Sequence, residues 1–400
     1  MTGNTEVVVI GGGYAGVMAA NRMTQRADVT VRLINPRRTF VERIRLHQLV
    51  AGSHEAVVDY GKVLGERVRL VVDTVTRIDA AGRRVTLASG GSVGYDYLIY
   101  AVGSDGAGPR VPGADEFAHP IATLEEVRRL RPVLDAAPAS AAVSVVGAGP
   151  AGIETAAELA EAGRAVTLVC GGVLGPYLHP RGRRSVAGRL GRLGVTVVEG
   201  PDTVVTAVTR DGVQLSDGRV LPSQVTIWTT GFGVPELASR SGLSTDSLGR
   251  LLTDETLTSV DDERIVAAGD AAAPSDLPFR MGCQSAVQLG PQAAETVLSR
   301  MAGRQPAPVS VGFAGQCISV GRRTGVFQFA HRNDVAVGVY LGGRPGARLK
   351  EFVCRSTVWQ LGYEARKPGT RTWWGKDDKR RLLLQDQSGE VPAAAGRVGR

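Results

Sequence analysis

Two segments of this chain repeat one pattern: a short apolar run, a glycine-rich turn and an alanine-rich stretch with helical spacing. The turns span residues 11–16 and 147–152, and β-branched runs follow at 29–34 and 165–169. A strand, a tight turn and a helix that leads back to a second strand make a βαβ unit. The sequence therefore predicts two such units.

The glycines of each turn are spaced for phosphate binding. They serve the tight turn, the approach of backbone to a pyrophosphate and the close packing of the helix on its strand. These positions hold Gly11, Gly13 and Gly16 in the first copy and Gly147, Gly149 and Gly152 in the second. The helix start then offers N–H donors and a positive dipole to the anion. An ordinary glycine turn could explain one copy, but two copies in strand–turn–helix context favour two dinucleotide sites.

Further motifs accompany the two turns, at residues 95–103, 111–113, 123–126, 229–232 and 265–272. With them the chain resembles, over residues 6 to about 360, the flavoproteins of the pyridine nucleotide-disulfide reductase superfamily. Within it, the resemblance is to the type II NADH dehydrogenase branch and also to apoptosis-inducing-factor-type oxidoreductases. It implies an α/β fold with two Rossmann-like domains, for FAD and for NAD(P), and a small α+β C-terminal domain.

A chain of 400 residues exceeds the length at which one core usually stops growing, so several domains are expected. The resemblance implies the following boundaries. They are 1–115 for the first part of the FAD domain, 116–240 for the inserted NAD(P) domain, 241–305 for the second part of the FAD domain, 306–365 for a C-terminal cap and 366–400 for a basic, partly disordered tail.

The expected FAD contacts include a carboxylate at the end of an apolar strand. There Asp270 would accept hydrogen bonds from the hydroxyls of the sugar-alcohol chain, and Gly269 permits close approach; a plain turn aspartate is the alternative. Asn35-Pro36 replaces the acid that usually holds the ribose, so the Asn35 amide or backbone takes that contact. The other expected cofactor contacts are Tyr14, Ala15, Arg43, Val75, Ala101, Gly103, Pro150, Ile153 and Gly231.

Four polar residues are candidates for catalytic roles. Glu154 lies in the first turn of the second helix and matches a family glutamate near nicotinamide and flavin, although a simple helix-start acid is the alternative. Gln284 precedes the helical stretch 286–301, whose N-terminus the resemblance directs at the flavin pyrimidine. Arg45 and His47 could contact cofactor or substrate, and the alternative for His47 is a structural role.

The cysteines restrict the chemistry. Disulfide reductases of this superfamily carry Cys-x-x-x-x-Cys after the first βαβ unit, but residues 37–48 contain no cysteine, so we expect no disulfide reduction by that route. The four cysteines are dispersed, which predicts no metal site and fits a reducing cytoplasm; Cys283 is taken as a packing residue. Cys170-Gly171 replaces the ribose-binding acid of the second fold and arginines follow at 181, 183 and 184, which slightly favours NADPH over NADH.

The C-terminal third has three short β-like runs, at 316–320, 325–330 and 335–341. A helix is expected from 347 to 365, and the resemblance makes this region a cap over the flavin. Its expected apolar face comprises Leu349, Phe352, Val353, Val358 and Leu361. Trp373-Trp374 and the basic run 376–381 precede Leu382–Leu384, a face too short to predict a membrane anchor, so peripheral association stays open. The last residues are expected to be disordered.

The net charge of +8 indicates a solvated basic surface or a field that favours pyrophosphate cofactors, and no recognition module accompanies it to suggest nucleic-acid binding. No leader and no run of roughly 20 apolar residues is present, so we expect a cytoplasmic protein, at most peripheral on the inner face of the membrane. Whether it is a monomer or a homodimer stays open.

The predicted function is hydride transfer from NADPH or NADH to FAD, with electrons then passing to a quinone-like or other small organic acceptor. One alternative is an oxidase or dehydrogenase of a specialised metabolite with a vestigial nicotinamide site. Another is a non-catalytic flavoprotein that recruits a protein partner.

Overall fold

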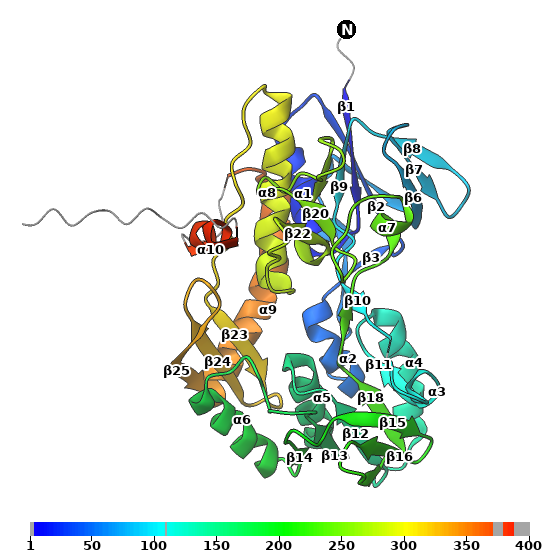
Figure 1. The fold of residues 1–400 in the computed structure, drawn as a ribbon, viewed down its shortest axis with the longest axis vertical. Coiled ribbons are helices and arrows are strands. Elements are labelled where there is room, and N and C mark those ends of the chain that lie inside the picture. Colours follow the sequence, from blue (N-terminus) through cyan, green and yellow to red (C-terminus); the bar gives the residue numbers. More distant parts are fainter. Residues whose placement is uncertain (1–3, 109, 371–378, 388–400) are drawn as a thin grey trace, which may run out of the picture.

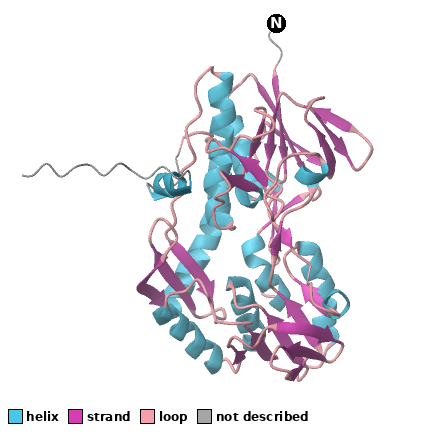
Figure 2. Cartoon of the chain, in the orientation of Figure 1, coloured by secondary structure: helices cyan, strands magenta, loops and turns pink. Residues whose placement is uncertain are grey.

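The computed structural model describes residues 4–108, 110–370 and 379–387. An upper and a lower lobe are joined near β10, and a small sheet with a long helix lies against both (Figure 1). Each lobe is built on a parallel sheet with helices packed against it (Figure 2). The expected α/β fold with two Rossmann-like sheets is confirmed, whereas the expected domain boundaries remain predictions.

The upper lobe contains the first sheet, in the order β21-β9-β1-β2-β5, with all neighbours parallel. Its strands are β1 (Thr5–Ile10), β2 (Val29–Asn35), β5 (Val68–Val72), β9 (Tyr97–Tyr100) and β21 (Ile265–Ala267). Alternate residues of β1 enter two cores: Val7 and Val9 pack with α1 (Tyr14–Met23) and α8 (Cys283–Met301), and Val8 and Ile10 pack with the β6-β7-β8 sheet. Burial on both faces explains the uninterrupted apolar run before the first glycine turn.

Helices α1 and α8 cross at short range. A Cβ at Gly290 of α8 would lie 2.3 Å from the backbone oxygen of Ala15, so only glycine permits this approach. Gly269, which precedes α8, likewise lies against Ala15 and Ala286. This crossing holds the start of α8 beside the first glycine turn.

The lower lobe contains the second sheet, in the order β11-β18-β12-β13-β14, again parallel throughout. Its strands are β11 (Ala118–Pro120), β12 (Ala142–Val146), β13 (Ala165–Val169), β14 (Thr196–Val198) and β18 (Val225–Trp228), and its helices are α3 (Ala114–Phe117), α4 (Leu124–Ala136), α5 (Pro150–Glu161) and α6 (Pro180–Arg192). A capping box between Thr123 and Glu126 begins α4.

Short elements complete the lobes. The antiparallel sheets are β6 (Val75–Asp79), β7 (Arg84–Leu87) and β8 (Ser92–Gly94); β15 (Val205–Thr209), β16 (Gly212–Leu215) and β17 (Val220–Pro222); β3 (Thr39–Val41) with β4 (Val57–Asp59); and β10 (Asp105–Gly106) with β19 (Phe232–Gly233). The remaining elements are the parallel pair β20 (Leu251–Thr253) and β22 (Ala272–Pro274), the helices α2 (Leu46–Ala51) and α7 (Leu237–Arg240), and the 3₁₀ turns η1 (Arg43–Arg45), η2 (Tyr60–Lys62) and η3 (Gly269–Ala271). Since β10 and β19 belong to the two crossings between the lobes, their pairing ties those crossings together.

The C-terminal cap consists of an antiparallel sheet and the long helix α9 (Gly343–Arg366). Its strands, β23 (Gly315–Ser319), β24 (Gly325–Ala330) and β25 (Ala336–Gly342), fall within a residue of the expected runs. The expected apolar face of α9 is buried only in part, because Leu361 is buried whereas Phe352 is 66% exposed and lines the cavity described below. The buried side of α9 is mostly polar and comprises Lys350, Cys354, Thr357, Gln360, Leu361 and Glu364.

Helix α9 is attached to α1 by buried polar contacts. The Arg22 guanidinium bonds Glu364 and also Glu295 of α8. The Asn21 side-chain amide donates to the backbone oxygens of Val63 and Leu361, at 2.8 and 3.2 Å. The cap is therefore anchored in the upper lobe at its far end.

Beyond α9 the structure describes one more helix, α10 (Lys379–Gln387), which the sequence analysis did not predict. Arg380 holds it by a 2.8 Å ion pair with Glu255 and by stacking over Phe279. Two expectations fall outside the described residues. They concern membrane association at Trp373-Trp374 and disorder of the last residues, 388–400. Over the described ranges, no helix combines the length and apolar character that crossing a bilayer requires.

Candidate active site

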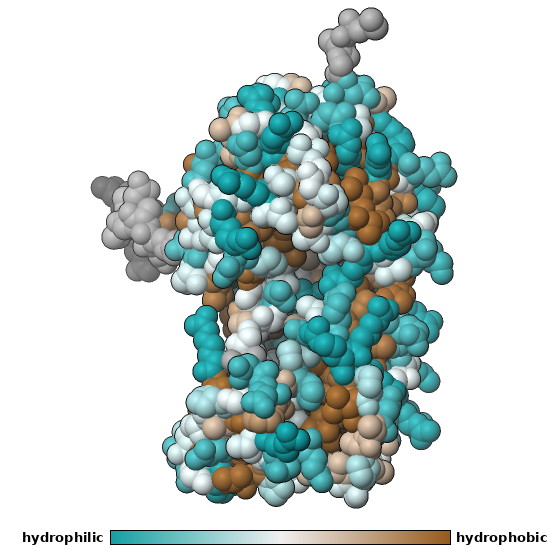
Figure 3. All heavy atoms as spheres, turned by 90° about the vertical axis from the view of Figure 1, so that its right-hand side faces the viewer, coloured by the Kyte–Doolittle hydropathy of each residue, from teal (hydrophilic) through white to brown (hydrophobic). Residues whose placement is uncertain are grey.

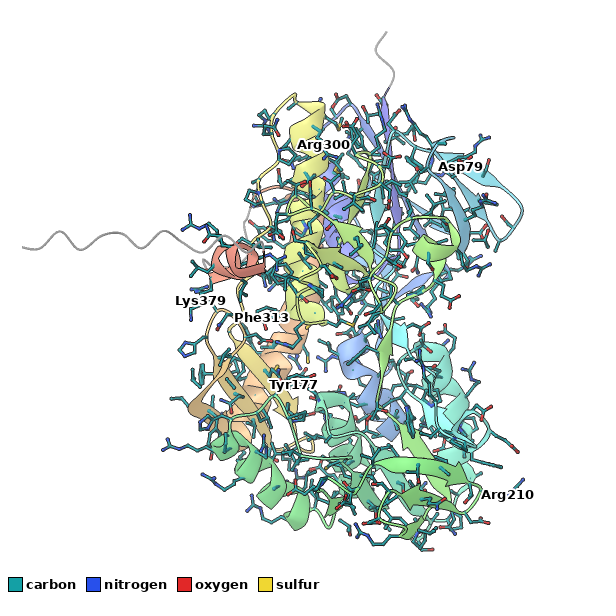
Figure 4. All side chains as sticks on the ribbon, in the orientation of Figure 1. Asp79, Tyr177, Arg210, Arg300, Phe313 and Lys379 are labelled. Atoms are coloured by element: carbon teal, nitrogen blue, oxygen red, sulfur yellow. The ribbon has the colours of Figure 1, made fainter. Side chains whose placement is uncertain are left out.

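A cavity of about 1850 Å³ extends between the lobes and along α9. The molecule is hollowed at mid-height on the face drawn in Figure 3, and Phe313 and Tyr177, labelled in Figure 4, line the cavity from above and below. Most of the predicted site residues line it. They are Gly11, Gly13, Tyr14, Ala15, Asn35, Pro36, Arg43, His47, Val75, Ala101, Gly103, Pro150, Glu154, Gly231, Gly269, Asp270 and Gln284.

The other predicted residues are not part of this lining. They are Gly16, Arg45, Gly147, Gly149, Gly152 and Ile153. Gly16 and Gly152 have a packing role, because a Cβ at either would lie 1.8 Å from the backbone oxygen of the first glycine in its own turn. At Gly13 and Gly149, by contrast, a Cβ would meet no protein atom within 4 Å. The middle glycines therefore face open space, as the approach of a pyrophosphate requires.

The helix starts at these turns keep their backbone donors. Gly13 caps α1 and Gly149 caps α5, and neither helix has a side-chain cap. The first N–H groups of an α-helix have no partner within the helix, so both turns present donors to an anion. This open backbone fits the pyrophosphates of two dinucleotides.

A polar cluster lies where the first fold meets α8. Asp270 accepts hydrogen bonds from the Ser104 hydroxyl at 2.7 Å and from the Gly282 N–H at 2.8 Å. Arg43 donates to the backbone oxygen of Ser104 at 2.7 Å. These hydrogen bonds fix the Asp270 carboxylate at the cavity wall, where it can accept further hydrogen bonds from hydroxyl groups. Sequence reasoning missed Ser104, although it follows the predicted contact Gly103.

Asn35 supports the first glycine turn from below. Its Oδ1 accepts from the Gly12 N–H at 3.0 Å, and its Nδ2 donates to the Arg37 backbone oxygen at 2.9 Å. The Tyr60 hydroxyl donates to the Gly12 oxygen at 2.8 Å. Asn35 therefore shapes the turn in addition to lining the cavity, and Tyr60 is a second residue that the sequence did not indicate.

Gln284 lies in the first turn of α8 and connects it to the cap. With its amide nitrogen toward Gly315 and its oxygen toward Ala314, it bonds the Gly315 oxygen at 3.2 Å and the Ala314 N–H at 3.0 Å. Cys283 and Ser285 line the cavity beside it. The N-terminus of this 19-residue helix therefore borders the cavity, where its dipole favours negative charge.

A buried ionic cluster joins both lobes and the cap. Glu154 of α5 accepts from Lys350 Nζ of α9 and from the Ser319 N–H of β23, each at 2.9 Å, and lies 3.4 Å from His47 Nδ1 of α2. Burial would lower the pKa of Lys350, but Glu154 raises it well above its ordinary value. Burial would likewise raise the pKa of Glu154, but the Lys350 ammonium and the Ser319 N–H hold it below its ordinary value. The cluster therefore holds a carboxylate and an ammonium that line the cavity together.

His47 is the neutral member of the cluster. Burial, supported by the charges of Lys350, Arg322 and Arg45, lowers the pKa of His47 to about 4. Its Nε2 lies 3.3 Å from the Ser319 hydroxyl. The imidazole therefore lies beside Glu154 as a neutral group, while Lys350 supplies the neutralising charge.

We expect this buried histidine to make stability depend on pH. Below its ordinary pKa of 6.5 the unfolded chain binds a proton that the folded chain refuses until about pH 4. Stability is therefore fully present above pH 6.5 and declines as pH falls toward 4, by about 3 kcal/mol. Urea unfolding across this range measures it. His47→Gln should flatten the decline, whereas His331→Gln, on an exposed turn, should keep it; equal slopes in all three proteins would contradict the assignment.

Arg45 is not brought to the cavity, which corrects its candidate role as a cofactor or substrate contact. The guanidinium is 3% exposed and pairs with Glu42 at 3.1 Å and with Glu351 at 3.0 Å. It also donates to Gln48 at 3.0 Å. The structure therefore gives Arg45 a connecting role between α2 and α9.

The cysteines are free thiols in the structure. Cys283 and Cys317 line the cavity, and burial raises the pKa of Cys283 to about 12. Within the described residues, no group of His, Cys, Asp and Glu side chains could hold a metal ion.

Comparison with known proteins identifies the family. The model of the pyridine nucleotide-disulphide oxidoreductases matches residues 5–296. An NADH dehydrogenase-like protein of Mycobacterium tuberculosis is 34% identical over 292 residues, which cover 67% of this chain and 73% of that protein. The type II NADH:quinone oxidoreductase of the same organism is 30% identical over 350 residues, 75% of this chain and 74% of that one.

Solved structures share the fold. NDH2 of Plasmodium falciparum, determined with NADH, superposes with a TM-score of 0.75 at 16% identity over 94% of this chain and 99% of that one. A NAD-dependent persulfide reductase of A. fulgidus matches 83% of this chain with a TM-score of 0.70 at 23% identity, and the chain spans only 65% of its length.

The family match extends from the first glycine turn, across the second, to within α8, and so includes both folds that form the cavity. The expectation of FAD together with NADH or NADPH is thereby confirmed. This chain is a flavin-dependent NAD(P)H oxidoreductase and belongs to the pyridine nucleotide-disulphide oxidoreductase family.

Proposed function

We propose that this enzyme passes electrons from NADH or NADPH to a quinone-like or other small organic acceptor. The observation that supports this most is one continuous cavity, which borders both glycine turns and one side of α9. When bound there, FAD supplies a centre that takes a hydride from nicotinamide and returns electrons to a second molecule. The likeness to a type II NADH:quinone oxidoreductase supports the same choice of acceptor.

The chain contributes position and charge. The turns and Asp270 fix the two nucleotides. The loss of their translational and rotational freedom is then met on binding and no longer adds to the barrier of hydride transfer. Leu349, Phe352, Val353 and Trp359 of α9 give the cavity an apolar wall. Lys350 Nζ, held by Glu154, adds one cationic donor on the same helix. A flat apolar ring that carries carbonyl oxygens, such as a quinone, suits this combination.

We also propose that the enzyme does not reduce disulfides through a cysteine pair beside the flavin. The segment that carries this pair in disulfide reductases here forms β3, η1 and α2, without a cysteine. Sulfur acceptors nevertheless belong in the assay, because the fold is shared with a persulfide reductase and Cys283 and Cys317 line the cavity.

Anaerobic mixing with each nucleotide tests the proposal. We expect NADPH and NADH both to abolish the visible flavin absorbance, with NADPH at least as efficient, because arginines at 181, 183 and 184 follow the missing ribose-binding acid. An advantage of about tenfold for NADH would overturn the NADPH preference. Reoxidation by a water-soluble quinone should exceed that by oxygen or by a persulfide. A flavin that no nucleotide reduces would favour the metabolite oxidase instead.

We propose a cytoplasmic protein, peripheral at most on the inner face of the membrane, that acts as a monomer or homodimer.

A further inference from the structure

A second pocket shares Lys350 with the cofactor cavity. It has a volume of about 320 Å³ and lies between the β23–β24 turn, the first turns of α9 and α2. Its lining residues are Gln48, Ser319, Gly321, Arg322, Arg323, Arg344, Ala347, Arg348, Lys350 and Glu351. We refer to this set as the basic pocket, because five of its ten residues are cationic and only Glu351 is acidic.

The one carboxylate of the basic pocket is already shared. Glu351 bonds Arg45 at 3.0 Å and Arg355 at 2.8 Å, and it lies 4.0 Å from Arg322. Arg322 also pairs with Glu158 of α5 at 3.4 Å. Among the described residues, Arg322 therefore has acidic partners, whereas Arg323, Arg344 and Arg348 have none.

Three rim arginines face the pocket unneutralised. Within residues 4–108, 110–370 and 379–387, the side chains of Arg323, Arg344 and Arg348 have no hydrogen bond and no ion pair, and all three are exposed. Arg344 and Arg348 are four residues apart on α9, so they project from one face of the helix. Like charges held together around a concave surface repel each other, and a bound anion would relieve this.

The floor of the basic pocket is polar and closed. Gln48, Ser319 and Lys350 are 1%, 5% and 8% exposed. Lys350 Nζ is fixed there by Glu154 at 2.9 Å and by the Cys317 oxygen at 3.4 Å. Such a floor does not suit an apolar ligand. Guanidinium groups, with donors in a planar fork, match the oxygens of phosphate better than ammonium groups do.

We propose that the basic pocket binds a phosphate-bearing anion at a site separate from both cofactors. Arg323, Arg344 and Arg348 would hold its oxygens from the rim, and the Lys350 ammonium would face it from the floor. Lys350 also lines the cofactor cavity and bonds Glu154. An anion bound in the basic pocket would therefore affect the oxidoreductase site through this one side chain. That last consequence rests on the proposed function, whereas the binding does not.

Calorimetry and thermal unfolding with sodium pyrophosphate test the binding. The protein is saturated with FAD and NAD⁺ at constant ionic strength, so that the glycine turns are occupied. We expect saturable binding and a raised Tm, with the affinity lowered at least about tenfold in Arg344→Gln/Arg348→Gln, because two charge-assisted contacts are lost. The matched control is Arg210→Gln/Arg304→Gln, which removes two exposed arginines away from the pocket and should bind as the wild type does; Arg210 lies on the β15–β16 turn of the lower lobe (Figure 4).

Vesicles distinguish the two sources of phosphate. Sedimentation with phosphatidylglycerol vesicles, compared with phosphatidylcholine, shows whether a lipid headgroup occupies the pocket. If the affinity for pyrophosphate depends on Arg344 and Arg348, the pocket binds a soluble ligand. If only the binding to phosphatidylglycerol vesicles depends on them, it binds the headgroup. Equal binding by the wild type and the pocket variant in both arms would overturn the proposal. Neither arm uses turnover, so its failure is distinct from a failure of the proposed function.

Discussion

Gly13→Ala is expected to give a folded protein that has lost most of its FAD. The backbone at Gly13 has φ −81° and ψ −167°, which alanine adopts without strain, and the added Cβ would meet no protein atom within 4 Å. The methyl group instead fills the space where backbone must approach the pyrophosphate. We expect the flavin content per protein to fall at least about tenfold, which corresponds to about 1.4 kcal/mol of binding. Absorbance of the purified protein and unfolding of its flavin-free form measure both parts of this result.

Two further alanine variants serve as controls. In Gly16→Ala the Cβ would lie 1.8 Å from the Gly11 oxygen, so the helix must move off its strand and the fold itself should fail. Gly149→Ala makes the same change as Gly13→Ala in the second fold, where a Cβ also meets open space. It should keep FAD and weaken the nicotinamide nucleotide instead. Full flavin content in Gly13→Ala would show that the first turn does not bind the pyrophosphate.

Lys350→Met should destabilise the protein by about 3–5 kcal/mol, because it leaves Glu154 as a buried charge without its neutralising partner. Glu154 is 4% exposed, and its other contacts, His47 and Ser319, carry no charge. Chemical unfolding of the flavin-free protein near neutral pH measures the loss. Lys62→Met, at an exposed position of η2, should change stability by less than about 0.5 kcal/mol.

The pH dependence separates this electrostatic loss from poor packing. Without Lys350 the pKa of Glu154 should rise, so the destabilisation should decrease as pH falls and the carboxylate takes up a proton. The double variant Lys350→Met/Glu154→Gln should recover much of the stability at neutral pH. A loss that persists at every pH and in the double variant would mean that the methionine side chain simply does not fit.

The parts of this molecule that the sequence could predict are those set by local rules. The glycine turns require their residues because of backbone geometry, and the strands beside them are apolar because both faces of each sheet are buried. The cap strands were found within a residue because Gly, Arg and Asn-Asp turns separate them. Asp270 could be singled out because it ends an apolar strand directly after Gly269, and its contact with FAD stays a prediction.

The parts that could not be predicted depend on long-range pairing of charges. Lys350 meets Glu154 across nearly two hundred residues of sequence, and no local pattern marks either residue as the other's partner. Arg45 was a candidate because its segment is unusually polar for one expected beside a flavin, but its side chain pairs with Glu351. The periodicity rule failed on α9 because it assumes that a buried helix face is apolar, whereas this face borders a cavity and pairs with ions.

The attachment of α9 to α1 has a consequence for how reactants enter the cavity and how products leave it. Movement of α9 away from α1 would break the buried Arg22–Glu364 pair. It would also remove the Leu361 oxygen that accepts a hydrogen bond from the Asn21 amide. Helix α9 is therefore expected to stay in place while reactants enter the cavity between the lobes. We therefore expect that opening of the cap does not limit the rate of product release, which stopped-flow measurement of turnover can test.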